Sequence, residues 1–318
     1  MTTHTLLPSQ QTLHGQYHRE LAPALTIDPG DEVVVQTYDV SWGMGQHQET
    51  WRPKFEPRVS PKDDGPCLCG PIAVRGAKPG MALRVRLDEI RPGDWGWTWS
   101  GPSVFHKDLL ARVGLGDHPN GLLRWTVDAD AKTALSERGH KVALDPFLGM
   151  IGLASDREGW QSGWFPQRTG GNLDCRALTA GSTIYFPVEV EGALLSLGDG
   201  HGRQGDGEVA GSAIECPMER VRLHIDLCER PLIPHLYADT PYGWVTFGLS
   251  EDLDEAVGQA LSAALDLLQA RLGVGRQEAL FLASAVVDLR VTQLVNKVRG
   301  VHAVLPHDAF LPTTTTTT

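Results

Sequence analysis

The chain has 318 residues and a mass of 34.6 kDa, which is enough to bury one large hydrophobic core or two smaller ones. Its formal net charge of −11 and the lack of any lysine- or arginine-rich stripe argue against nucleic acid as a partner. The longest apolar stretches, such as residues 279–287, are about half as long as a membrane span, and residues 1–8 do not resemble a secretory signal. We therefore expect a cytoplasmic protein with no membrane partner.

The N-terminal part predicts strands separated by a long loop. Residues 25–37 contain a Pro-Gly turn that leads into a β-branched run, and residues 76–87 repeat this pattern. Together they predict an antiparallel N-terminal sheet with alternating faces. Residues 42–71, between them, are polar and rich in Pro, Gly and aromatic residues, which is typical of a long ordered loop.

The middle of the chain is rich in tryptophan, proline and glycine. In residues 95–168 only one alternating strand stands out, at residues 121–127. The tryptophans of this region fit core packing better than a substrate pocket. Further strands are expected at residues 181–190, 193–198 and 221–227.

Helical patterns are clear only in the last third of the chain. Residues 252–272 place their apolar side chains on one stripe, and Gly273 follows as a helix-ending residue. A second helix is expected at residues 276–287. The sequence thus predicts an α+β protein that is β-rich, with antiparallel sandwich- or barrel-like sheets and with helices concentrated in the C-terminal third.

Cysteine usage does not indicate a disulfide framework, because five cysteines are an odd number in a long chain. Cys67 and Cys69 form half of the pattern of a zinc site, but Cys175, Cys216 and Cys228 are isolated. Free thiols are the favoured interpretation, and the role of Cys67 and Cys69 stays open.

The stretch most suggestive of chemistry is residues 198–208, GDGHGRQGDGE. It combines five glycines with several acids and one histidine between two expected strands. Glycine permits tight backbone turns, so several short carboxylates can point inward from such a loop. A cluster of carboxylates and an imidazole suits a borderline divalent cation such as zinc, whereas calcium needs more oxygen ligands.

Two other interpretations of this stretch compete with a metal site. Gly200, Gly202 and Gly205 match the spacing of a dinucleotide-binding fingerprint, but a true fingerprint opens a helix, and residues 208–215 suggest another strand. The second is a glycine hairpin with solvated acids. Against it stand further acids in turn-like contexts at Asp174 and Asp39, although an Asx-turn or a strand cap also explains each of these alone.

Taken together, these segments resemble the acetamidase/formamidase family. The central matches occur in the family's order, at residues 171–174, 180–193, 198–208 and 213–215. The likeness also includes residues 27–31, 70–72, 288–293 and 300–303, so it covers most of residues 25–310.

The resemblance implies hydrolysis of a small carboxamide, such as formamide or acetamide, to the carboxylate and ammonia by metal-activated water. It also implies a homo-oligomer, either a dimer or a multiple of one. As a working hypothesis, the ligands of a divalent ion, with zinc preferred and calcium as the alternative, are Asp39, Asp174, Asp199 and His201. Glu208 is assigned as the general base and acid, and Asn172 or Gln204 as contacts to the amide.

Two rival functions remain open from the sequence. Many amidases use a covalent nucleophile, and Cys175, Ser182 and Ser196 lie near the expected site, but no G-x-S-x-G elbow is present. The second rival is a noncatalytic ligand-binding β-protein, because fold does not fix function.

The sequence suggests a division into three parts. Residues 1–168 form a β-rich region with long loops, and residues 169–310 combine the expected metal site with the C-terminal helices. Residues 311–318 form a low-complexity threonine tail that cannot bury a core.

Overall fold

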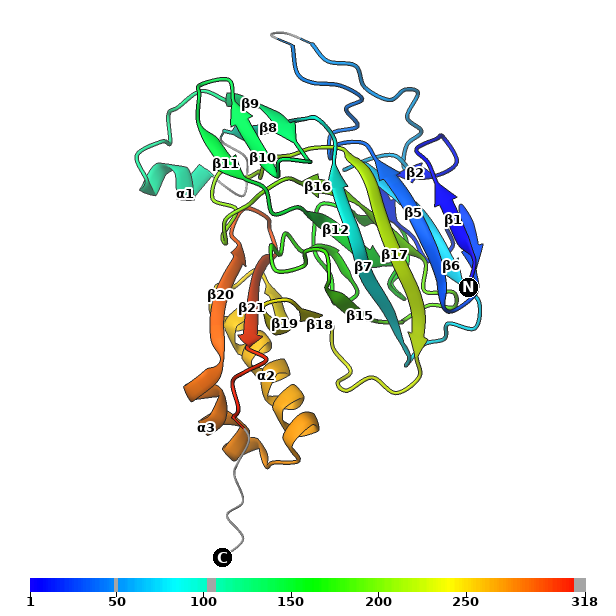
Figure 1. The fold of residues 1–318 in the computed structure, drawn as a ribbon, viewed down its shortest axis with the longest axis vertical. Coiled ribbons are helices and arrows are strands. Elements are labelled where there is room, and N and C mark those ends of the chain that lie inside the picture. Colours follow the sequence, from blue (N-terminus) through cyan, green and yellow to red (C-terminus); the bar gives the residue numbers. More distant parts are fainter. Residues whose placement is uncertain (49–50, 102–106, 312–318) are drawn as a thin grey trace, which may run out of the picture.

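The computed structural model describes residues 1–48, 51–101 and 107–311, so residues 312–318 of the expected tail lie outside the described part. Strands dominate the molecule, and the two longer helices lie near the C-terminus (Figure 1). The predicted α+β, β-rich class is therefore confirmed. Among the described residues, no helix is long and apolar enough to span a bilayer.

The largest sheet has nine strands and is antiparallel except where β1 pairs with β5. In pairing order it contains β1 (Thr3–Leu6), β5 (Asp31–Thr37), β17 (Met218–Cys228), β7 (Ala82–Pro92), β15 (Thr183–Pro187), β18 (Tyr237–Thr240), β19 (Gly243–Ser250), β21 (Arg299–Leu305) and β20 (Asp288–Gln293). The two expected N-terminal strand units, β5 and β7, do not pair with each other, because β17 lies between them. The sheet joins strands from both sides of residue 168, so the division at that residue stays a sequence-based prediction.

A second sheet packs against the first and forms the centre of the molecule. Its path is β14 (Gly170–Asn172), β12 (Phe147–Leu153), β16 (Leu195–His201), β6 (Leu68–Val74) and β2 (Leu13–His14), and β4 (Leu25–Ile27) pairs with β6. Every residue of β6, β12 and β16 is buried. Apolar side chains of both sheets form one large core, which includes Val33 and Leu83 from the first sheet and Ile72 and Leu195 from the second.

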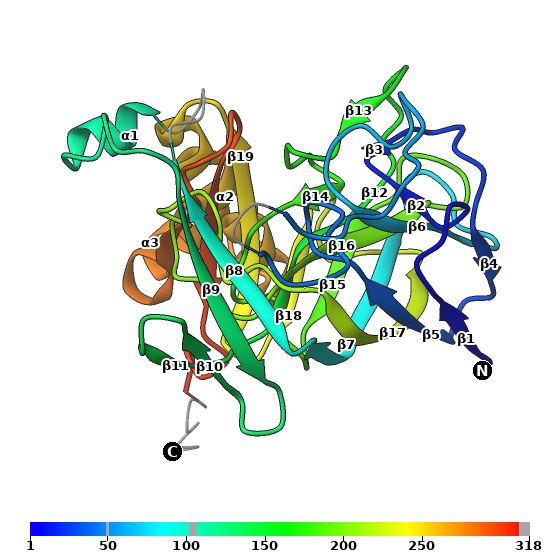
Figure 2. The same ribbon diagram turned by 90° about the horizontal axis from the view of Figure 1, so that it is seen from above.

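Two smaller sheets lie at the edges of this core. One contains β8 (Trp95–Ser100), β9 (Gly121–Asp128), β10 (Thr133–Ser136) and β11 (Lys141–Ala143), and the other pairs β3 (Gln16–Tyr17) with β13 (Gln161–Ser162). Figure 2 shows the β8–β9 hairpin on the side of the molecule away from the N-terminus. The strand expected at residues 121–127 corresponds to β9, whereas its partner β8 was not predicted.

The two C-terminal helices follow the predicted boundaries closely, whereas a third, short helix was not predicted. The helices are α1 (Lys107–Arg112), α2 (Leu253–Leu272) and α3 (Arg276–Val286). The Asp252 side chain accepts a hydrogen bond from the Glu255 N–H and caps α2, and Gly273 ends it with φ at 68°. Helix α2 packs directly on β19, because a Cβ atom at Gly248 would lie 1.8 Å from the Ala256 carbonyl oxygen.

Two local predictions were wrong. Residues 198–201 do not form a loop but the end of the buried strand β16. Residues 208–215 form turns and irregular structure rather than another strand, apart from an isolated bridge at Glu215. The chain therefore turns after β16 and folds back beside it, which determines how the acids of this stretch are placed.

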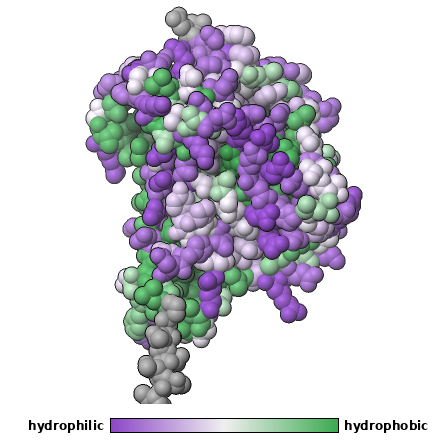
Figure 3. Space-filling view, viewed as in Figure 1, coloured by the Kyte–Doolittle hydropathy of each residue, from purple (hydrophilic) through white to green (hydrophobic). Residues whose placement is uncertain are grey.

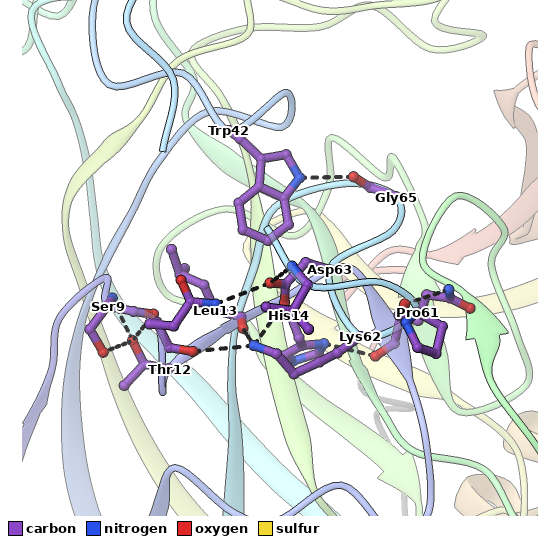
Figure 4. Close-up of polar contacts among 12 residues, drawn as sticks. Ser9, Thr12, Leu13, His14, Trp42, Pro61, Lys62, Asp63 and Gly65 are labelled. Atoms are coloured by element: carbon purple, nitrogen blue, oxygen red, sulfur yellow. Dashed lines mark hydrogen bonds and ion pairs between the residues drawn. The ribbon is translucent and has the colours of Figure 1, made fainter. Parts of the chain in front are cut away.

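The long loop after β5 is ordered by side-chain hydrogen bonds to the backbone (Figure 4). The Trp42 indole Nε1 donates to the Gly65 carbonyl at 2.9 Å, and Lys62 Nζ donates to the Leu13 carbonyl at 2.5 Å. These contacts hold this part of the chain against β2. Residues 49 and 50 of the expected loop lie outside the described part, and its expected end at residue 71 lies inside β6.

Candidate functional site

Strand β16 brings Asp199 and His201 to the same face, because side chains two residues apart in a strand point the same way. The glycines on either side of Asp199 are required by close packing. A Cβ atom at Gly198 would lie 2.3 Å from the Cys67 carbonyl oxygen, and one at Gly200 would lie 2.6 Å from that of Cys216. These glycines therefore permit close backbone approach within a strand, rather than the tight turns of a loop that the sequence suggested.

Three further acids meet the two residues of β16. Asp174 follows β14, and Glu208 and Glu215 lie on the segment that folds back after β16. Possible ligand atoms of Asp174, Asp199 and His201 lie within 4.8 Å of one another, and so do those of His201, Glu208 and Glu215. His201 belongs to both groups, and all five side chains are buried.

The backbone is strained at three of these acids. Asp174, Asp199 and Glu208 have φ angles of 50°, 53° and 47°. The left-handed region costs a non-glycine residue about 1–2 kcal/mol, so it persists only where the surrounding structure enforces it. These three residues supply carboxylates to the two groups that share His201, and such strain is typical of functional sites.

The buried charges perturb one another strongly. Burial and the charge of Asp199 hold the pKa of Asp174 well above its usual range, and burial and Asp174 do the same for Glu208. Burial raises the pKa of Glu215 to about 7. Burial disfavours the His201 imidazolium, but the charges of Glu215 and Asp199 outweigh this and raise its pKa well above the usual value. A positive charge is therefore stabilised at the centre of the cluster.

The cluster has room and free ligand atoms for a cation. Asp174 Oδ1 and His201 Nδ1 are buried without a hydrogen-bond partner among the described residues. A Cβ atom at Gly149 would lie 2.5 Å from Asp199 Oδ2 and 2.8 Å from Asp174 Oδ1, so the space between these acids depends on that glycine. Carboxylates with one imidazole form a donor set that a divalent ion such as zinc can use.

Asp39 lies outside both groups of potential ligands. One of its oxygens pairs with Arg52 and accepts from the Trp97 Nε1 at 2.7 Å, and the other accepts from the backbone N–H groups of Ser41 and Gly43 at 3.0 and 2.7 Å. These partners leave Asp39 poorly placed to bind an ion, so the geometry does not support its assignment as a ligand.

The two predicted amide contacts differ in their surroundings. Asn172 lines the cavity described below, and its Oδ1 is buried without a hydrogen-bond partner. Gln204 does not line it, and its Nε2 donates to the Asp174 carbonyl at 2.7 Å. The arrangement thus favours Asn172 as a substrate contact and makes Gln204 a support for Asp174.

Sequence reasoning missed two residues of the site. Glu215 lies beyond the glycine-rich stretch 198–208 and appeared only as part of the family resemblance, although an acid soon after that stretch was a usable signal. Asn296 follows β20, and its Nδ2 donates to Asp174 Oδ2 at 3.3 Å. No local pattern marked Asn296, because only the tertiary fold brings it beside Asp174.

A cavity of about 1140 Å³ opens beside the cluster, and Asp174, Asp199, Glu208 and Glu215 form part of its wall. Aromatic side chains line much of the remainder, including Trp97, Trp99 and Trp164. Trp97 also packs in a buried apolar cluster, so core packing and pocket lining are not alternatives for this residue.

The predicted rival nucleophiles are poorly placed for covalent catalysis. Cys175 is fully buried, and burial raises the pKa of its thiol to about 12, which disfavours the thiolate. Ser182 donates to the Ala177 carbonyl, and Ser196 is hydrogen-bonded to the ring of His14 at 2.9 Å. None of the nucleophile candidates lines the cavity, and all five cysteines are free.

The family model described as the Acetamidase/Formamidase family matches residues 2–163 and 161–232. The chain belongs to the acetamidase/formamidase family. This confirms the family resemblance of the sequence, and the matched range includes Asp174, Asp199, His201, Glu208 and Glu215.

Curated members of the acetamidase/formamidase family are similar over part of their length. The acetamidase of Mycolicibacterium smegmatis is 28% identical over 253 residues, which are 62% of this chain and 61% of the relative. The formamidase of Methylophilus methylotrophus is 26% identical over 246 residues, with 62% and 59% covered. The chain thus spans about three fifths of these relatives.

Solved structures agree over nearly the whole chain. The acetamidase from Bacillus halodurans has a TM-score of 0.81 at 26% identity, with 95% of this chain and 97% of that chain covered. A predicted acetamidase/formamidase from Thermoanaerobacter tengcongensis has a TM-score of 0.81 at 28% identity, with 96% of each chain covered. A gamma lactamase from Delftia acidovorans shares the fold alone, at 22% identity and a TM-score of 0.61.

Proposed function

We propose that this chain hydrolyses a primary carboxamide to the carboxylate and ammonia, with a divalent metal ion held by Asp174, Asp199 and His201. Zinc is the preferred ion, and calcium is the alternative. The observation that carries the proposal is the buried group of acids around His201, which faces a cavity large enough for an organic substrate. The family relationship supports the choice of an amide, because the similar proteins include an acetamidase and a formamidase.

An amide is a weak electrophile, so its attack by water needs activation of the water and protonation of the leaving nitrogen. A bound divalent ion supplies Lewis-acid polarisation and lowers the pKa of a water ligand. Glu208, buried at the cavity wall, takes the proton from the attacking water and delivers it to the departing ammonia. The added water is thereby divided between the carboxylate product and ammonia.

Neighbouring amide side chains orient the reacting groups. The unpartnered Oδ1 of Asn172 can accept a hydrogen bond from the substrate NH₂ group. Asn296 donates to Asp174 and holds that carboxylate in place. Preorganised contacts of this kind accelerate a reaction because the groups need not reorganise in the transition state.

An ammonia-release assay with metal control tests this function. We expect ammonia from at least one primary amide, loss of activity after chelation and recovery when zinc is added back. Thiol alkylation should leave the activity intact, since the cysteines are not used. Full activity without any stoichiometric divalent ion would contradict the metal role. A complete lack of ammonia release at every metal loading would favour the noncatalytic rival.

We also propose that the protein forms a homo-oligomer, either a dimer or a multiple of one, and that it is cytoplasmic. In Figure 3 the lower part of the molecule, over α2 and α3, is largely hydrophobic. Exposed apolar side chains there are Leu272, Leu280, Phe281 and Leu289, and the last lies on β20 at the edge of the large sheet. Pairing two copies about a two-fold axis would remove this patch from water.

Light scattering at micromolar concentration should therefore report at least about twice the chain mass of 34.6 kDa. Phe281→Lys is expected to weaken assembly at least about 100-fold, because each of two symmetric copies would lose a buried phenyl ring. Val113→Lys, at a side chain of similar exposure (61% against 66%) outside the patch, is the matched control. A monomeric mass throughout a dilution series would refute assembly without affecting the proposed hydrolysis.

A further inference from the structure

The cavity beside the acid cluster is much larger than the smallest amides require. Its volume of about 1140 Å³ corresponds to roughly 40 water molecules at their liquid volume. Ligand cavities usually bury most of the surface of the molecule they bind. Formamide or acetamide would fill only a small part of this space and leave the remaining wall in contact with water.

One part of the cavity wall is apolar, although polar residues such as Gln48 and Lys54 line other parts. Val40, Trp97 and Met150 belong to one buried cluster, and Trp99 and Leu122 pack against it. All five residues line the cavity. A methyl group or a hydrogen atom could not cover this surface, whereas an aromatic ring or a long alkyl group could.

The apolar wall is fixed to the acid cluster by the backbone. The Trp97 N–H donates to the Glu215 carbonyl at 2.9 Å, and the Glu215 N–H donates to the Trp97 carbonyl at 2.8 Å. Two residues further along β8, the Trp99 N–H donates to Ser212 Oγ at 2.8 Å. The spacing between the aromatic wall and the carboxylates is therefore set by the fold rather than by flexible side chains.

Asp39 and Arg52 hold the central indole in place. Asp39 accepts from Trp97 Nε1 at 2.7 Å, and the guanidinium of Arg52 lies over the Trp97 ring, 5.2 Å from its centroid. Because Asp39 and Arg52 also pair with each other, their charges compensate. This part of the cavity therefore suits an uncharged acyl group.

We propose that the substrate is the primary amide of an acid with a large apolar acyl group, such as an arylacetic acid. Its amide lies at Asp174, Asp199 and Glu208, and its ring packs against Trp97 and Trp99. The water oxygen bonds to the acyl carbon and the C–N bond breaks, and the nitrogen leaves as ammonia with a proton from the water while the aryl-substituted carboxylate remains. This inference rests on the proposed amidase function and specifies its substrate class.

Steady-state kinetics with phenylacetamide and acetamide test the substrate class. Burying a phenyl-sized group is expected to raise kcat/KM for phenylacetamide by roughly 10- to 150-fold over acetamide. Leu122→Trp narrows the cavity and should move this ratio toward one. Leu135→Trp, at a 48% exposed position on β10 outside the cavity lining, is the matched control and should keep the wild-type ratio.

Binding separates this inference from the amidase proposal. Calorimetry with phenylacetamide and the Glu208→Gln protein should detect binding that Leu122→Trp weakens. If acetamide is turned over and kcat/KM for phenylacetamide is no higher than for acetamide, the substrate class is wrong and the amidase function stands. Binding of phenylacetamide without turnover of either amide by the metal-loaded wild type would overturn the amidase function and support the apolar pocket. Neither binding nor turnover would overturn both.

Discussion

Glu208→Gln should retain the bound metal ion but lower kcat by about 10²–10⁴-fold, the usual contribution of a positioned acid–base group. Glutamine keeps the shape of the side chain, but it cannot accept a proton from the attacking water. Glu208 is buried at the cavity wall, close to Asp174. The measurement is kcat together with the metal content of the same preparation.

The control for this variant is Glu191→Gln, which makes the same chemical change at an exposed turn. It should match the wild type in both metal content and kcat. If Glu208→Gln loses the ion as well, Glu208 is a ligand together with His201 and Glu215, which is the second group that the geometry allows. Near-normal turnover would make Glu208 a structural residue.

The elements predicted best are those whose signals are local. The boundaries of α2 follow from Asp252 and Gly273, which act on residues a few positions away. Strands that alternate between a buried and a more exposed face, such as β5 and β17, were also recognisable. Their pairing order was not, because β17 inserts between β5 and β7 from far along the chain.

The start of the central strand β16 was predicted at residues 193–198, but its end was misread because its residues obey a different constraint. A strand buried on both faces has no alternation, and Gly198 and Gly200 weaken any strand pattern. Both glycines are needed where neighbouring backbones come too close for a side chain, and only coordinates show that contact. The structure places Asp199 and Glu208 of this stretch in the two groups of potential ligands, but the structure that presents them was not predicted.

Asp39 shows why single acids are difficult to assign from sequence. Its position after a strong strand was predicted correctly, and it is fully buried near the site. Whether a buried carboxylate binds a metal or a cation from the protein depends on its neighbours in space. Here the cation beside Asp39 is the Arg52 side chain. Arg52 lies in a loop without a regular sequence pattern, so its position could not be predicted.

Removing His201 and neutralising Asp174 should both weaken metal binding. The two changes should have opposite effects on the stability of the metal-free protein. The charges of Glu215 and Asp199 hold the pKa of His201 high, so the imidazolium compensates these acids. His201→Ala removes that compensation and should lower the free energy of unfolding by about 1–3 kcal/mol. Asp174→Asn removes a carboxylate whose ionisation is opposed by burial and by the charge of Asp199. This substitution should therefore raise the free energy of unfolding by about 1 kcal/mol at neutral pH.

The stabilisation of the metal-free protein by Asp174→Asn should depend on pH. The pKa of Asp174 is higher in the folded protein than its ordinary value of 3.8, so the metal-free wild type loses stability as the pH rises above about 4. Asp174→Asn lacks this loss, and its advantage should therefore be small near pH 4, where the carboxyl group is neutral in the folded state and only partly ionised in the unfolded state. Denaturant unfolding of chelated protein at pH 4 and pH 7 measures this, with Asp254→Asn at an exposed position of α2 as the matched control.

Added zinc should make the wild type more stable than Asp174→Asn, which reverses the order of their free energies of unfolding in the metal-free state. An ion that binds only the folded state stabilises it by about 2.7 kcal/mol at 100 times its Kd, so the wild type gains this amount while both site variants gain little. Loss of activity should accompany the loss of the ion in each variant. A chelated Asp174→Asn protein less stable than wild type at pH 7, or variants stabilised by zinc as much as wild type, would show that this cluster is not the metal site. The acids would then serve the fold, and the strained backbone at Asp174, Asp199 and Glu208 would need another explanation.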